Sequence, residues 1–105
     1  MIFELRTYTA APGRMEDLLQ RFRDHTIKLF PDHGIHNVGY WLSREAPNVL
    51  VYLVRHEGEP DDNWKGFKAD PRWVAARAAS VANGELTVNI ASAYLTATDF
   101  SPLGP

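Results

Sequence analysis

Residues 2–10 read IFELRTYTA, and the segment alternates along its length. Alternation with a period of two, with many β-branched and aromatic residues, is typical of a β-strand that has two different faces. Glu4, Arg6 and Tyr8 share one of these faces. The dipeptide Pro12–Gly13 predicts the end of the strand. The chain therefore begins with a strand that carries a polar face.

The segment that follows predicts a helix over residues 13–32. Apolar side chains recur there at three- and four-residue steps, which places them in one stripe along a helix. Gly34 predicts the end of this helix, because glycine readily adopts the left-handed conformation that closes a helix. Pro31 is expected to deform the last turn, since proline has no amide hydrogen to donate.

Two more strands follow, and a short turn separates them. Residues 35–43 predict the first strand, and residues 49–56 predict the second. The turn at residues 44–48 contains Ala-Pro-Asn and is short enough to make the pair a hairpin. Residues 49–54 are all apolar or aromatic, which is typical of a strand that is covered on both faces.

The last third of the chain predicts an interrupted helix and a fourth strand. A short helix is expected over residues 63–69. Asp70 is expected to cap a second helix with Pro71 at its first position, since the residue before a proline is pushed out of the helical region. This helix ends at Asn83–Gly84, and residues 86–96 predict the fourth strand.

The order β-α-β-β-α-β predicts an α+β domain, a ferredoxin-like plait with a four-stranded antiparallel sheet and its helices on one face. The other face then stays wet or meets a partner, so we expect a homodimer formed through this open sheet face. Phe3 and Leu5 suit the helix-covered face. Glu4, Arg6 and Tyr8 are therefore expected to point at the partner.

The composition fits one domain spanning residues 1–105. Eleven Lys and Arg stand against 13 Asp and Glu, and no basic stripe offers the phosphate contacts that a nucleic acid needs. The chain has no cysteine, which excludes disulfides and favours a reducing cytoplasm. No signal-peptide pattern opens the sequence, and no apolar run approaches the roughly 18 residues of a membrane span. We expect a cytoplasmic protein that binds no nucleic acid and has no membrane span.

Five short motifs are spread over nearly the whole chain: ELRTYT at residues 4–9, PG at 12–13, HG at 33–34, VGYW at 38–41 and ADPRW at 69–73. In this order and spacing they resemble the NIPSNAP family, within the dimeric α+β barrel superfamily. One departure is DNWKGFK at residues 62–68, where family members often carry an arginine-rich stretch.

The resemblance implies a ferredoxin-like protomer whose sheet packs on the sheet of a second copy to form a closed barrel. The superfamily includes cofactor-free monooxygenases, isomerases, haem-degrading enzymes and binding proteins. The resemblance therefore implies a function among these classes without choosing between them. No cofactor is expected.

Four residues are candidates for acid–base chemistry. His25 lies on the flank of the apolar helix stripe, where it could reach a cleft between helix and sheet, and His56 ends the third strand. An imidazole titrates near neutral pH and could act as a general base. Arg6 or Tyr8 could then steady an enolate-type charge. The structural alternatives are a surface histidine for His25 and an interface ion pair with a hydrogen bond for the first strand.

Aromatic side chains predict either a ligand pocket or part of the core. As a pocket they would suit a small apolar or aromatic ligand, although aromatic residues more often pack in a core. The candidates are Trp41, Tyr52, Trp64, Phe67 and Trp73.

The pair His33 and His36 raises the question of a metal site. The pair straddles a predicted helix end and strand start, so the two rings need not converge. No third ligand stands at a convincing spacing. We expect no metal.

Three functions follow from these patterns. The first, which we expect, is a homodimeric small-molecule-binding protein without catalysis, because it needs only the fold. The second is a cofactor-independent monooxygenase- or isomerase-like enzyme acting on a flat small molecule, which requires a cavity reached by a histidine. The third is a protein-interaction module that uses the tail from Phe100.

Overall fold

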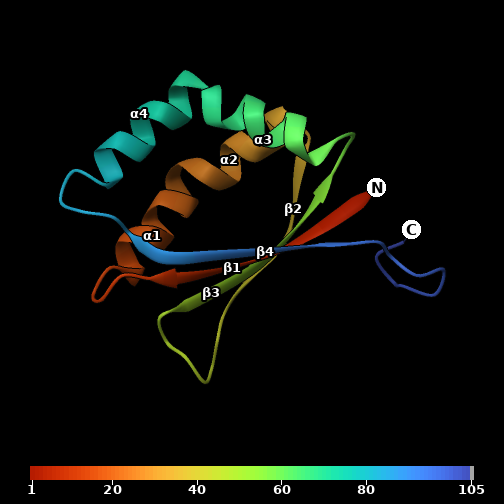
Figure 1. Ribbon diagram of the computed structural model, residues 1–105, viewed down its shortest axis with the longest axis horizontal. Coiled ribbons are helices and arrows are strands. Elements are labelled where there is room, and N and C mark those ends of the chain that lie inside the picture. Colours follow the sequence, from red (N-terminus) through yellow and green to blue (C-terminus); the bar gives the residue numbers. More distant parts are fainter. Residues whose placement is uncertain (105) are drawn as a thin grey trace.

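The structure is a computed structural model that describes residues 1–104. The helical elements α1 to η2 follow one another without a break and form one long helical segment (Figure 1). In chain order the elements are β1 (Ile2–Ala10), α1 (Met15–Arg21), the π-helical turn η1 (Phe22–Thr26), α2 (Ile27–Leu29), the 3-10 turn η2 (Phe30–His33), β2 (Ile35–Leu42), β3 (Val49–His56), α3 (Pro60–Ala69), α4 (Pro71–Ser80) and β4 (Thr87–Leu95).

The four strands form one antiparallel sheet in the order β2-β3-β1-β4. The helices lie on one face of this sheet, and the other face is uncovered (Figure 1). This arrangement confirms the predicted ferredoxin-like α+β fold. The apolar strand β3 is an interior strand, as its continuous apolar run predicts.

The C-terminal end of the first helical segment confirms the predictions made from Pro31 and Gly34. The turn η2 contains Pro31 and has 3-10 geometry, so proline deforms the last turn as expected. Gly34 follows with a φ of 73°, the left-handed conformation that glycine adopts easily. The π-helical turn η1 in the middle of the segment was not predicted, because a single wide turn leaves the apolar spacing almost unchanged.

The second helical segment begins earlier than expected, at Pro60. Proline suits the first turn of a helix, where an amide hydrogen has no partner within the helix. At the interruption, Asp70 has the extended φ and ψ of −64° and 121°, and its side chain accepts a hydrogen bond from the amide of Arg72. This geometry confirms Asp70 as the cap of α4.

The polar face of β1 lies under the helices, which corrects the prediction that it points at a partner. Glu4 is fully buried, and the ring of Tyr8 contacts that of Phe22 in η1, with centres 5.6 Å apart. Both faces of β1 carry apolar side chains, so alternation alone could not say which face the helices cover. Leu5, expected under the helices, lies on the open face.

The open face of the sheet carries exposed apolar side chains. The strand register places Leu5 opposite Leu53 and Trp41 opposite Val51. Leu5 is 36% exposed and Trp41 is 55% exposed. The ring of Trp41 lies over Gly39, where a Cβ would come within 2.5 Å of it. Polar side chains share this face, since Thr7 lies opposite Val51 and Arg55 opposite Phe3.

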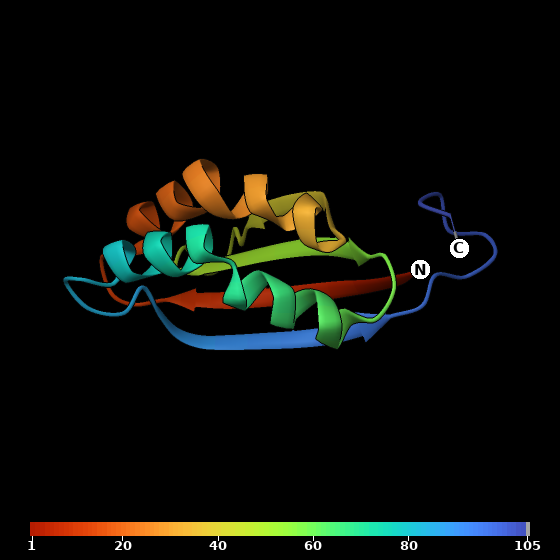
Figure 2. The same ribbon diagram turned by 90° about the horizontal axis from the view of Figure 1, so that it is seen from above.

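Strand β4 lies beyond the cover of the helices. Every residue from Val88 to Leu95 is exposed. Viewed from above, most of β4 lies outside the helix layer (Figure 2). The helix-covered face of β1 is therefore open along one side, between α3–α4 and β4.

No helix within residues 1–104 is both long enough and apolar enough to span a membrane.

After β4, residues 96–104 run away from the sheet and helices (Figures 1 and 2). Phe100 in this tail is 81% exposed. The prediction that the tail recruits a partner stays a prediction.

Candidate functional site

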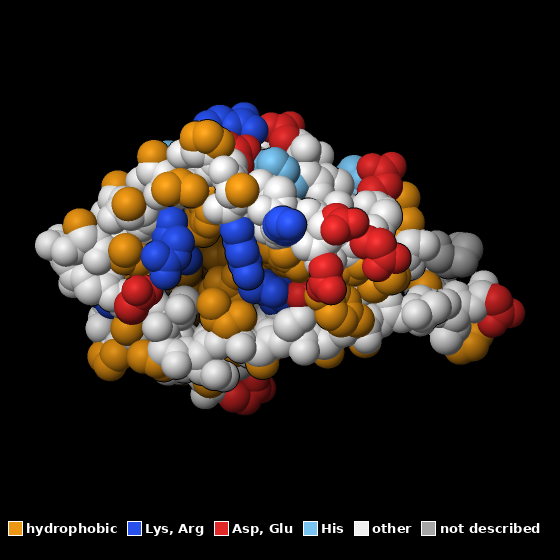
Figure 3. All heavy atoms as spheres, turned by 45° about the horizontal axis from the view of Figure 1, so that its top comes forward, with side chains coloured by type: hydrophobic (Ala, Val, Ile, Leu, Met, Phe, Trp, Pro, Cys, Tyr) orange, Lys and Arg blue, Asp and Glu red, His pale blue; other side chains and the backbone are white. Residues whose placement is uncertain are grey.

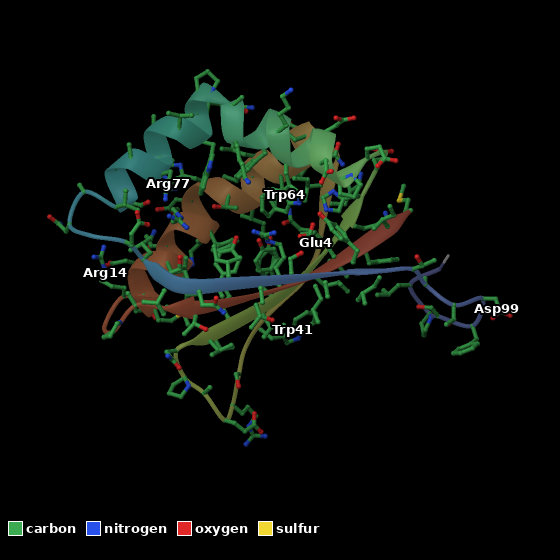
Figure 4. The ribbon with its side chains drawn as sticks, in the orientation of Figure 1. Glu4, Arg14, Trp41, Trp64, Arg77 and Asp99 are labelled. Carbon is green, nitrogen blue, oxygen red and sulfur yellow. The ribbon has the colours of Figure 1, made fainter. Side chains whose placement is uncertain are left out.

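The carboxylate of Glu4 is the centre of a polar cluster between the sheet and the helices. Its Oε1 accepts hydrogen bonds from His56 Nε2 at 2.7 Å and from Trp64 Nε1 at 2.8 Å. Its Oε2 accepts from Arg6 Nη1 at 2.8 Å and from Ser92 Oγ at 2.5 Å. Glu4 thus connects three strands and α3, and Figure 4 shows it facing Trp64 beneath the helix.

The imidazole of His56 is contacted at both ring nitrogens. Asn63 Nδ2 donates to the carbonyl of Glu57 at 2.9 Å and lies 3.2 Å from His56 Nδ1. Because an ionised carboxylate only accepts, His56 Nε2 is the donor in its hydrogen bond to Glu4. His56 is fully buried, and both of its ring nitrogens are engaged. Its role is to hold Glu4.

The two charges of the cluster stabilise each other. Burial alone would raise the pKa of the Glu4 carboxyl, but the four hydrogen bonds that it accepts outweigh burial and lower its pKa to about 2. Burial would also lower the pKa of Arg6, but the neighbouring Tyr52 and Tyr8 outweigh it and raise this pKa above its usual range. Both side chains are therefore charged at neutral pH.

The guanidinium of Arg6 is held on three sides. Besides its bond to Glu4, its Nε donates to the Tyr52 hydroxyl at 2.8 Å, and its Nη2 donates to the Tyr8 hydroxyl at 3.1 Å. It also lies over the Trp64 ring, 4.3 Å from the ring centre. A guanidinium has five N–H donors, so two remain without a partner among the described residues.

The hydroxyls of Tyr8 and Tyr52 form a pair behind this guanidinium. Their oxygens lie 3.0 Å apart, and the two rings pack edge to face with centres 5.3 Å apart. Burial, together with neighbouring Tyr8, raises the pKa of Tyr52 well above its ordinary value, so its phenol stays protonated. The pair fixes the direction in which Arg6 points.

A groove runs beside the cluster, between α3–α4 and β4. It consists of two adjoining hollows of about 640 Å³ and 780 Å³, which share Arg6, Trp64 and Lys68. In Figure 3, Lys and Arg side chains stand around a hollow whose interior is hydrophobic. We call this the helix–strand groove. Its principal lining residues are Arg6, Tyr8, Trp64, Phe67, Lys68 and Trp73.

The aromatic residues predicted to form a pocket lie in three different places. Trp64, Phe67 and Trp73 line the helix–strand groove. Tyr52 is fully buried behind it. Trp41 lies on the opposite side of the sheet from Glu4 and Trp64 (Figure 4), which corrects the prediction that it shares a pocket with them. The register of β2 decides this position, and the register is not visible in the sequence.

The two histidines considered as general bases do not reach the groove. His25 is exposed on η1 and lines a shallow hollow on the outside of the helix layer, beside Ala76 and Ala79. His56 is enclosed behind Glu4. Arg6 and Tyr8 do line the groove, and these two candidates come together there.

The histidines of the considered metal pair point to different carboxylates. His33 Nε2 lies 2.8 Å from Asp70 Oδ2, and His36 Nε2 lies 3.2 Å from Glu57 Oε2. Across residues 1–104, no three His, Asp or Glu side chains gather as metal ligands would.

Three residues of the site escaped sequence reasoning. Ser92 is a single serine in a strand, and only the register shows that it lies opposite Arg6. Asn63 stands in a helix that begins earlier than expected. Arg21 ends α1 and lines the groove, although nothing in the helix pattern distinguishes it from other surface arginines.

Fold and site together define the class: a ferredoxin-like α+β protein with an uncovered sheet face and a groove between its helices and an edge strand. The NIPSNAP family pattern matches residues 3–102. The chain belongs to the NIPSNAP family, as its motifs indicated.

Solved structures agree with this assignment. A NIPSNAP family protein of unknown function from Agrobacterium tumefaciens is 27% identical, with 98% of this chain and 93% of that one covered and a TM-score of 0.79. An uncharacterised NIPSNAP domain protein from Burkholderia xenovorans is 21% identical, covering 97% and 99% of the two chains, with a TM-score of 0.78.

The fold extends beyond the family. A putative antibiotic biosynthesis monooxygenase from Nitrosomonas europaea is 11% identical, covering 92% of this chain and 98% of that one, with a TM-score of 0.66. This likeness is one of fold alone. No curated protein matches the chain significantly.

Proposed function

We propose that the protein is a homodimer that binds a small, flat organic molecule in the helix–strand groove. The observation that carries this proposal is the state of Arg6, whose direction is fixed by Glu4, Tyr8 and Tyr52 while two of its N–H donors stay free beside the groove. A carbonyl or hydroxyl oxygen of a ligand would accept from Arg6 without any rearrangement of the side chain.

The walls of the groove suit such a ligand. Rings from Trp64, Phe67 and Trp73 provide an apolar surface, and Arg6 and Tyr8 add a few fixed polar atoms. Small-molecule sites typically combine apolar walls with a few placed polar groups, in cavities of roughly 300–1,000 Å³. The hollow of about 640 Å³ falls within this range.

Binding without catalysis is the function that the site supports best. An isomerase or monooxygenase of the kind considered from the sequence would need a base beside the ligand, and neither His25 nor His56 lines the groove. Arg6 and Tyr8 are accordingly assigned to ligand contact.

The dimer part of the proposal rests on the apolar open face. A second copy would cover Leu5, Trp41 and their neighbours with a surface of the same kind, as a two-fold interface requires. Arg55, opposite Phe3 in the register, has a buried Nε without a hydrogen-bond partner among the described residues. A partner could supply its acceptor. The absence of cysteine supports a cytoplasmic location as part of this proposal.

The three tryptophans provide a direct test. We would titrate 6-hydroxy-2-naphthamide, a flat neutral compound with oxygen atoms at both ends, into ¹⁵N-labelled protein and follow the indole N–H signals by NMR. The signals of Trp64 and Trp73 are expected to shift, while that of Trp41, on the other sheet face, stays in place. Shifts confined to Trp41, or no shifts at all, would contradict the proposal.

A matched pair of variants extends the test. Arg6→Gln removes the free donors and is expected to weaken binding of the naphthamide by about tenfold, as loss of a charged hydrogen bond does. Arg23→Gln, an exposed arginine on η1, makes the same change of charge away from the groove and is expected to leave binding unchanged.

A further inference from the structure

Arg21 is a partly buried cation that forms no ion pair within residues 1–104. It ends α1 and lines the helix–strand groove, where its guanidinium lies 5.1 Å from the centre of the Trp73 ring. Its Nη1 donates to Ser80 Oγ at 3.1 Å. Its Nε is buried without a hydrogen-bond partner, and within residues 1–104 no carboxylate forms an ion pair with it.

This state is energetically unfavourable in the free protein. Burial lowers the pKa of Arg21 and the charge of Arg77 adds to the effect, while Tyr8 and Glu85 only partly oppose it. Buried charges are normally paired, and a buried donor without an acceptor is destabilising. Arg6 shows the contrast, because Glu4 neutralises it within the chain. Arg21 therefore has no carboxylate in direct contact among the described residues.

One nitrogen of Arg21 remains for a carboxylate. Nη1 donates to Ser80, and Nε, which has no hydrogen-bond partner, is buried. Nη2 has no partner among the described residues and is the donor that a carboxylate in the groove would meet.

We infer that the ligand of the groove is an aromatic carboxylate whose anionic group binds Arg21, while an oxygen at its other end accepts a hydrogen bond from Arg6; this inference rests on the proposed function of the groove. The rings between the two arginines form a row. Arg6 lies over Trp64, and Arg21 lies over Trp73. Phe67 stands between them, with ring centres 5.9 Å from Trp64 and 4.7 Å from Trp73.

The row of Trp64, Phe67 and Trp73 has neighbouring ring centres 5.9 Å and 4.7 Å apart, and this length favours a ligand with two rings over a ligand with one. Figure 4 shows Arg77 toward the α1–α4 end of the groove and Trp64 with Glu4 toward the other, so the two ends are distinct. At the Arg21 end, Arg77 adds a second cation, although Glu85 lies 3.3 Å from it at the surface. Lys68 lines both hollows and forms no ion pair within residues 1–104.

The groove, and not the outside of the helices, is the side on which the anion binds. On the outer side, the hollow that Arg21 lines also contains Asp17 and Asp24. These carboxylates repel an anion. In the helix–strand groove, the cations Arg6, Lys68 and Arg77 surround the same space, with Glu85 paired to Arg77.

The test compares two compounds that differ only in charge. We would measure the dissociation constants of 6-hydroxy-2-naphthoate and 6-hydroxy-2-naphthamide by calorimetry at low salt. The carboxylate is expected to bind at least about tenfold more tightly than the amide, because a charge-assisted hydrogen bond replaces a neutral one. In Arg21→Gln this preference should fall below about twofold. Arg23→Gln is the charge-matched control and should keep the preference.

A second measurement covers the case in which Arg21→Gln does not fold. In the wild-type protein, the Arg21 Nε–H signal in an NMR spectrum should move on addition of the carboxylate and stay in place with the amide. If both compounds bind equally and that signal does not move, the inference is wrong while the groove remains a binding site. If neither compound shifts Trp64 or Trp73, both the proposed function and the inference fail.

Discussion

The carboxylate of Glu4 and the imidazole of His56 lie 2.7 Å apart, and both side chains are fully buried between the sheet and α3. Asn63 contacts the other nitrogen of the ring. Hydrogen bonds thus run from Asn63 through His56 and Glu4 to Arg6, which lines the groove. A structural hydrogen-bond network therefore sets the position of Arg6.

The first prediction concerns stability at acid pH. The folded-state pKa of Glu4 is about 2, below its ordinary value of 4.5, so the unfolded chain takes up this proton first as the pH falls. The stabilisation is fully present above pH 4.5 and is lost as the pH falls toward 2. It amounts to about 3 kcal/mol, from the size of the shift. Urea unfolding between pH 2 and 7 measures it.

The variant Glu4→Gln removes this titration. It also places an amide among the donors that Glu4 satisfied, so we expect a loss of about 3 kcal/mol in stability at pH 7 and a flatter pH profile. Glu16→Gln, exposed on α1, is the control and should keep the wild-type profile. An unchanged acid slope in Glu4→Gln would show that another carboxyl is responsible.

The second prediction concerns the indole donor of Trp64. Trp64→Phe leaves Glu4 with three donors and removes the ring with the strongest attraction for the Arg6 cation. The free energy of unfolding should fall by about 2 kcal/mol. Trp41→Phe, on a half-exposed side chain, should change it by less than about 0.5 kcal/mol. Equal effects in the two variants would argue against the cluster as described.

The third prediction concerns self-association. Leu5→Arg introduces a charge into the apolar open face and should convert the dimer to a monomer, measured by light scattering. Ile27→Arg, which replaces an apolar residue of similar exposure on α2, should stay dimeric. A Leu5→Arg protein of unchanged mass would place the interface elsewhere.

The fourth prediction uses the close approach of Trp41 to Gly39. In Gly39→Ala the new Cβ would lie 2.5 Å from the ring, so the exposed end of Trp41 has to move. We expect weaker self-association with less than about 1 kcal/mol lost from the stability of the protomer, since no core residue is displaced. An undisturbed dimer would mean that Trp41 lies outside the interface.

Local sequence patterns were sufficient to predict the structure of a segment where its own residues determine its conformation. Residues 2–10 and 49–56 are strands with the bounds that their composition predicts. Gly34 and Asp70 terminate and cap helices because of backbone preferences that act within a few residues. The Glu4–Arg6 ion pair also follows from spacing alone, because residues two apart in a strand share a face.

By itself, the sequence determined the elements, their order and hence the ferredoxin-like sheet, since these depend on periodicity and short-range capping. Only the tertiary structure decided which face of β1 the helices cover, because both faces contain apolar residues and the choice depends on donors from distant segments. Those donors, His56, Trp64 and Ser92, come from β3, α3 and β4. Their convergence on Glu4 turned a strand predicted to face a partner into the floor of a groove, and it left the opposite face of the sheet uncovered.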